Sequence, residues 1–111
     1  DAADHFVFVV PEYNGSIPGV LKLFIDACNY PHSFRGKSAV LVGLAAGKGG
    51  NATGLAHLQD ILVYFGMHVH PQNLTLPMIR GKMHADGGLA DVDAKNTLQA
   101  LLHGYVHAVT A

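Results

Sequence analysis

The feature that most constrains this chain is an unbroken apolar run over Phe6–Val10, ended by Pro11. The run contains only aromatic and β-branched residues, which favour strands. Because no polar residue alternates with them, we expect both faces of this strand to be buried, as in a parallel sheet covered by helices. Ser38–Leu44 is a second apolar run. The two runs together predict an α/β fold with a parallel sheet.

A helical pattern follows each of these runs. The first helix is expected from an N-cap at Ser16 to about Asn29, with an apolar stripe of i, i+3, i+4, i+7 spacing. The second is expected from a cap at Asn51 or Thr53 to about Phe65, with Gly66 as its C-terminal glycine. Repeated strand–helix units imply parallel strands joined by right-handed crossovers.

The last third of the chain gives weaker signals. A short strand is expected over Met67–His70, with Leu74–Leu76 as a candidate extension. Pro77–Leu89 lacks a clean periodicity and contains three glycines, which predicts a loop. A final helix is expected to begin at Asp91 or Asp93.

Three strands would leave Phe6–Val10 at an edge of the sheet, although its composition is that of a central strand. An open edge this apolar invites aggregation. The sequence begins directly on Asp1–Asp4, with no element before the first strand. We therefore expect that a neighbouring strand lies outside this sequence, supplied by a longer native chain or by another chain.

Two turns reach the edge at which ligands bind in open α/β sheets, beyond the carboxyl ends of the strands. They are Pro11–Ser16 and Ala45–Asn51. Their glycines permit close approach to the backbone, and their N–H groups are expected to be free for an electron-rich acceptor. These glycines are Gly15, Gly47, Gly49 and Gly50. The glycines alone leave two readings open, a ligand loop and a tight connection between strand and helix.

Generic nucleotide motifs match this second turn poorly. The spacing of Gly47, Gly49 and Ala52 fits a loose dinucleotide fingerprint, but no acidic residue follows at the end of the next strand. Gly43–Lys48 is one residue short of a Walker loop and is not followed by Ser or Thr. These departures argue against an NTPase, and no Gly-x-Ser-x-Gly elbow supports a hydrolase.

The ionisable residues exclude several other classes. The net charge is −1 and no Lys/Arg cluster occurs, so neither a nucleic acid nor a membrane surface is an expected partner. Two histidine pairs, His68 with His70 and His103 with His107, lack a local third ligand, so we expect no metal site. The single cysteine, Cys28, fits a reducing cytoplasm.

The segment Pro11–Lys22, with the sequence PEYNGSIPGVLK, resembles the signature of the NAD(P)H-dependent FMN reductase family. The turn Gly47–Asn51 resembles that family's flavin-facing glycine loop. The resemblance covers essentially the whole chain. It implies a flavodoxin-like, doubly wound parallel sheet in three α/β/α layers, of which residues 1–111 would be the C-terminal portion with the last three strands. The N-terminal strands of that fold would be missing.

The resemblance also implies a function. The family binds FMN without a covalent bond and uses NAD(P)H as co-substrate. It passes electrons to a quinone, an azo compound, free flavin or a metal oxyanion, and it often forms dimers or tetramers through the helix that follows Ile17. The implied cofactor-binding residues are Pro11, Glu12, Tyr13, Asn14, Gly15, Ser16, Ala46, Gly47, Lys48, Gly49 and Gly50.

The resemblance implies no catalytic side chain, because the flavin carries the chemistry. The family's phosphate-binding loop has no counterpart here, so residues 1–111 alone are not expected to bind FMN tightly. Two alternatives remain open at this stage. One is a non-catalytic flavodoxin-like module that binds FMN or carries electrons, and the other is an inert fragment that keeps only an assembly surface.

Overall fold

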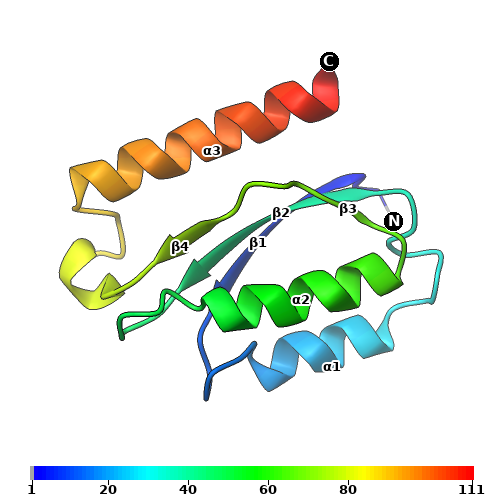
Figure 1. Ribbon diagram of the computed structural model, residues 1–111, viewed down its shortest axis with the longest axis horizontal. Coiled ribbons are helices and arrows are strands. Elements are labelled where there is room, and N and C mark those ends of the chain that lie inside the picture. The colour runs from blue at the N-terminus through cyan, green and yellow to red at the C-terminus, as the bar shows by residue number, and fades with distance from the viewer. Residues whose placement is uncertain (1) are drawn as a thin grey trace.

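The computed structural model describes residues 2–111, and its centre is a parallel sheet (Figure 1). Strands β1 (His5–Pro11) and β2 (Ser38–Leu44) pair over their whole length, from His5 opposite Ser38 to Pro11 opposite Leu44. Along the edge of β2 that faces away from β1, two short strands follow each other. These are β3 (His68–Val69), which pairs with the first part of β2, and β4 (Leu74–Leu76), which pairs with its end.

The helices complete three layers, as Figure 1 shows. Helices α1 (Gly19–Ala27) and α2 (Ala52–Tyr64) lie on one face of the sheet, and α3 (Val92–Thr110) lies on the other. A single 3₁₀ turn, η1 (Ile79–Lys82), lies within the predicted loop between β4 and α3. The α/β/α layering predicted from the sequence is confirmed. Across residues 2–111, no helix combines the length and the hydropathy needed to cross a bilayer.

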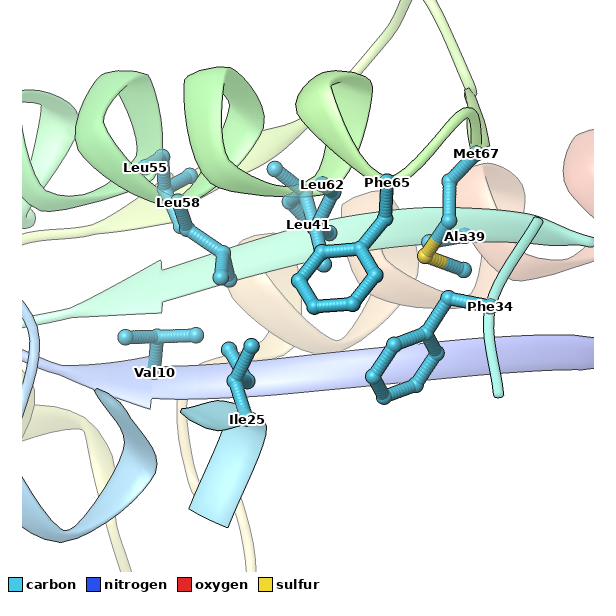
Figure 2. Packing of buried hydrophobic residues seen from close by; sticks show 10 residues of the cluster. All are labelled: Val10, Ile25, Phe34, Ala39, Leu41, Leu55, Leu58, Leu62, Phe65 and Met67. Atoms are coloured by element: carbon cyan, nitrogen blue, oxygen red, sulfur yellow. The ribbon is translucent and has the colours of Figure 1, made fainter. Parts of the chain in front are cut away.

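Strand β2 is apolar throughout because it contributes to two separate hydrophobic clusters. Ala39 and Leu41 point towards α1 and α2, whereas Val40 and Val42 point towards α3. All four side chains are at most 1% exposed. Figure 2 shows the first cluster. It contains Val10, Ile25, Phe34, Ala39, Leu41, Leu55, Leu58, Leu62, Phe65 and Met67.

Strand β1 differs from the expectation of a strand buried on both faces. Phe6 and Phe8 pack into the cluster beneath α1 and α2. On the opposite face, Val7 is 49% exposed and Val9 is 59% exposed, because α3 lies over β2 and β4 and not over β1. Within residues 2–111, β1 pairs only with β2 and so lies at one edge of the sheet.

The start of α1 also corrects a prediction. The helix begins after Pro18, which has extended φ/ψ and no side-chain cap, and Ser16 is not its N-cap. For α2 and α3 the structure selects one of the two predicted caps, because Asn51 accepts from the N–H of Gly54 and Asp91 accepts from the N–H of Ala94. The predicted third strand is split into β3 and β4 around Pro71, which lacks the N–H that a continuous ladder needs.

Helix α3 is attached to the amino end of the sheet by a hydrogen-bonded chain. The hydroxyl groups of Tyr105 and Ser38 lie 2.6 Å apart, and Ser38 Oγ lies 2.7 Å from His5 Nδ1. Tyr105 is 3% exposed, and its ring meets the edge of the His70 ring. The hydroxyl of Tyr105 therefore connects α3 to β2 in a largely desolvated place.

Replacing Tyr105 with phenylalanine is expected to lower the free energy of unfolding by about 0.5–1.5 kcal/mol. The ring and its packing remain, and only the hydrogen bond to Ser38 is lost. Urea denaturation measures the change. The matched control is Tyr64→Phe, since Tyr64 is 74% exposed on α2. Equal stabilities of the two variants would contradict the role assigned to the Tyr105 hydroxyl.

Candidate functional site

The two predicted turns meet at the carboxyl end of the sheet. The first loop, Pro11–Ser16, begins at the last residue of β1, and the second loop, Ala45–Asn51, follows β2. The backbone N–H of Glu12 donates to the carbonyl of Leu44 (2.9 Å), so the parallel ladder continues to the base of both loops. A pocket of about 370 Å³ lies between them. Its walls are Glu12, Gly15, Ala45, Gly47, Lys48, Gly49, Asn51, Ala52 and Thr53.

The first loop is a tight turn closed by its own backbone. The N–H groups of Tyr13 and Ser16 donate to each other's carbonyl groups, at 3.0 and 3.1 Å. Asn14 and Gly15 have φ values of 52° and 82°, which explains an asparagine followed by a glycine at these positions. The N–H of Gly15 donates to Glu12 Oε2 (2.6 Å), so the prediction of a free N–H at Gly15 is wrong. The carboxylate of Glu12 stabilises this turn.

The second loop has a fixed base and an open tip. At its base, Ala45 N–H donates to the carbonyl of Leu76 (3.1 Å), and Met78 N–H donates to the carbonyl of Gly47 (2.8 Å). These bonds attach the loop to the segment after β4. At its exposed tip, the backbone N–H groups of residues 46–49 have no acceptor among residues 2–111, and neither does the N–H of the buried Gly50. The free donors predicted for Gly47, Gly49 and Gly50 are therefore present here.

Glycine is required at two places in this loop and leaves open space at two others. A Cβ on Gly43 would lie 2.6 Å from the carbonyl oxygen of Gly50, so Gly43 lets the loop fold back onto β2. Gly50 has φ +59° and packs against Thr75. By contrast, a Cβ on Gly47 or Gly49 would meet no atom of the protein. Gly47 and Gly49 thus leave room for a ligand beside the free N–H groups.

The pocket includes five of the eleven residues implied by the resemblance. They are Glu12, Gly15, Gly47, Lys48 and Gly49. The other six, Pro11, Tyr13, Asn14, Ser16, Ala46 and Gly50, belong to the same two loops but do not line the pocket. Tyr13 is 59% exposed beside it, and Gly50 is buried at the loop base.

The structure adds contacts that the sequence did not reveal. Ser16 Oγ lies 2.7 Å from His57 Nδ1, so the end of the first loop is hydrogen-bonded to α2. The side chain of Asn51 binds the carbonyl of Val10 at the end of β1. These bonds join residues 41 positions apart, which no local pattern signals. The remaining wall residues, Ala52 and Thr53, are the first two residues of α2. The N-cap predicted at Asn51 is the sequence signal that could have placed them beside the second loop.

The arrangement suits an electron-rich, planar ligand. Backbone donors near the start of α2 favour partial negative charge, by hydrogen bonding and by the helix dipole. The pocket volume lies in the range typical of small-molecule sites. Within residues 2–111, no group of three or more His, Cys, Asp or Glu side chains is placed to hold a metal ion. The pocket offers a ligand the backbone N–H groups of the second loop, with Lys48 as a cationic residue among its walls.

Comparisons with known proteins agree on one family. The family model described as NADPH-dependent FMN reductase matches residues 1–80. The NAD(P)H-dependent FMN reductase PA1204 of Pseudomonas aeruginosa is 40% identical over 106 residues, which cover 91% of this chain and 56% of that protein. The NAD(P)H:quinone oxidoreductase of Solanum tuberosum is 36% identical, over 92% of this chain and 54% of that protein.

A solved structure has the same fold. FerB, a flavoenzyme NAD(P)H:(acceptor) oxidoreductase from Paracoccus denitrificans, superimposes with a TM-score of 0.81 at 29% identity, covering 96% of this chain and 60% of FerB. The likeness confirms the flavodoxin-like parallel sheet. The chain spans little more than half the length of the curated relatives named above. With its family model, its relatives and its fold in agreement, the chain belongs to the NADPH-dependent FMN reductase family.

Proposed function

We propose that the protein is an FMN-dependent NAD(P)H oxidoreductase whose flavin ring lies in the pocket between the first and second loops. When bound, FMN accepts a hydride from NAD(P)H and passes the electrons to a second acceptor. The observation that carries this proposal is the shared pocket itself. Two loops from adjacent strands form it, and one of them presents free backbone N–H groups beside Gly47 and Gly49, where an added side chain would meet no protein atom.

The residues of the pocket fit the flavin in three ways. The open space at Gly47 and Gly49 admits a flat ring close to the backbone. The backbone N–H groups of residues 47–49, which line the pocket, are free to donate to the electron-rich edge of the ring, where they would stabilise negative charge. The bonds at the base of the second loop hold these donors in place before a ligand binds. In this proposal no side chain acts as an acid, a base or a nucleophile.

We propose a quinone as the second acceptor. Relatives named as quinone reductases come from Burkholderia sp. (29% identical) and from Solanum tuberosum (36% identical). The exposed ring of Tyr13 beside the pocket offers a surface on which a planar acceptor can stack. The free thiol of Cys28 is consistent with the reducing cytoplasm in which we place this reaction.

We also propose that the protein is a homodimer or homotetramer assembled through α1. This helix exposes three large apolar side chains, Val20 (74%), Leu23 (69%) and Phe24 (57%). Tyr30, just after α1, and Tyr64, at the end of α2, are also exposed and stack with their centroids 5.5 Å apart. Exposed apolar side chains that share one helix face, as the i, i+3, i+4 spacing of Val20, Leu23 and Phe24 places them, are typical of a protein interface.

The test uses the full-length protein that contains these residues. We expect a yellow protein whose visible flavin absorption is bleached by NADPH or NADH and returns when a benzoquinone is added. Light scattering on the same sample gives the subunit number.

A colourless protein that FMN does not reconstitute would contradict the proposal, and a monomer would contradict the assembly through α1. A yellow protein unaffected by both nicotinamides would indicate the electron carrier. If the colour returned only with an azo dye, free FMN or a metal oxyanion, that compound and not a quinone would be the second acceptor.

A further inference from the structure

The amide side chain of Asn51 is buried, with 3% exposure. Its Nδ2 donates to the carbonyl of Val10 (3.0 Å), and its Oδ1 accepts from the N–H of Gly54 (3.1 Å). These two partners fix the orientation of the amide, since one requires a donor and the other an acceptor. Both polar atoms of the side chain are thus satisfied inside the protein.

The two bonds join elements that carry different loops. Val10 is the residue before Pro11, from which the first loop starts. Asn51 is the last residue of the second loop and the N-cap of α2. One side chain therefore connects the end of β1, the second loop and the first turn of α2.

The local backbone is built around this side chain. Asn51 has φ 67° and ψ 33°, a left-handed conformation that asparagine tolerates better than most residues. A Cβ on Gly54 would overlap Asn51 Oδ1, so the amide occupies space that glycine at position 54 leaves free. The tight packing includes the residue before Asn51, because the carbonyl oxygen of Gly50 occupies the space that a Cβ on Gly43 would need.

We propose that Asn51 is a positioning residue of the FMN pocket, which fixes the separation of the first and second loops. The inference rests on the function proposed above. A ring bound by both loops needs their contacting groups held to a fraction of an ångström. Asn51 supplies a connection that is buried and therefore not weakened by competition with water.

A capping role alone would not require asparagine. Serine and aspartate cap helices as well as asparagine does, because each offers an oxygen to the N–H three residues on. The bond to the Val10 carbonyl requires a donor. An ionised aspartate has none, and the serine side chain is too short for its hydroxyl to reach the position of Asn51 Nδ2. The two roles therefore predict different results above all for aspartate, which caps a helix and tolerates the left-handed conformation but cannot donate to the Val10 carbonyl.

The experiment compares Asn51→Asp and Asn51→Ser with Asn96→Asp in the full-length protein. Asn96 is exposed on α3, so its substitution makes the same change of charge away from both loops. FMN affinity is measured by quenching of flavin fluorescence, and the fraction of folded protein by circular dichroism. The second variant at position 51 is neutral, which avoids placing a carboxylate against the Val10 carbonyl.

We expect both Asn51 variants to bind FMN roughly tenfold more weakly or worse after correction for the folded fraction. We also expect the visible absorption spectrum of their bound flavin to be shifted, a signature that a loss of fold stability alone does not produce. Asn96→Asp should match the parent protein in both measurements. Unchanged affinity and spectrum in the folded Asn51→Ser protein would overturn the inference. Failure of the proposed function is distinguishable, because the parent protein itself would then not bind FMN.

Discussion

Replacing Gly50 with alanine is expected to lower the free energy of unfolding by about 2–5 kcal/mol and to weaken FMN binding. Gly50 has φ +59°, which a side chain disfavours. Its added Cβ would lie 2.7 Å from the Cβ of Thr75 and 3.2 Å from the backbone nitrogens of Leu76 and Pro77. Two of these neighbours are backbone atoms that cannot rotate away. The base of the second loop must therefore shift away from β4.

Chemical denaturation of the FMN-free protein measures the first effect, and fluorescence titration with FMN measures the second. The matched control is Gly49→Ala, in the same loop. Gly49 has no positive φ, and its Cβ would meet no protein atom, so its stability should stay within about 1 kcal/mol of the parent. Its FMN affinity should nevertheless fall, because the methyl group would enter the space assigned to the ring. Equal stabilities of the Gly50 and Gly49 variants would refute the close packing on β4.

Replacing Leu58 with alanine is expected to lower the free energy of unfolding by about 2–5 kcal/mol. Leu58 lies on α2 and is 0% exposed, in the cluster that packs α2 against the sheet (Figure 2). The substitution removes its transfer free energy and leaves a cavity, since the strands beneath it are held by their ladder. The helix would be loosened where it supports the second loop.

The control for Leu58 is Val63→Ala on the same helix, at a position that is 54% exposed. It also shortens an apolar side chain but creates no internal cavity, so its stability should change by less than about 1 kcal/mol. Urea denaturation curves compare the two variants. A Leu58 variant as stable as the Val63 variant would show that this cluster does not hold α2 in place.

Much of the fold could be predicted because it depends on local pattern. The apolar runs of β1 and β2 have no polar interruption, and Ser38–Leu44 coincides with the strand observed. Asn51 and Asp91 were predicted caps because their side chains act within three residues. Ser16 offered the same local chemistry, but its hydroxyl pairs with His57, which a nearest-neighbour pattern cannot signal.

The site was predictable only in outline. Parallel strands bring their carboxyl ends to one edge, so topology alone placed the two loops together. The choice of hydrogen-bond partners was not predictable, and Glu12 takes up the N–H of Gly15 that was expected to be free. The bond between Asn51 and Val10 spans 41 positions, and its existence depends on how α2 approaches β1. The exposed face of β1 was missed because its sequence is that of a covered strand.

The division of the second loop into a fixed base and an open tip has an evolutionary consequence. Ala45 and Gly50 are buried, whereas residues 46–49 are exposed, and three of them, Gly47, Lys48 and Gly49, line the pocket. Substitutions at these four positions can alter which molecules are accepted at little cost to folding. Directed evolution aimed at new substrates should therefore begin with randomised libraries at 46–49 and keep the flanking residues constant.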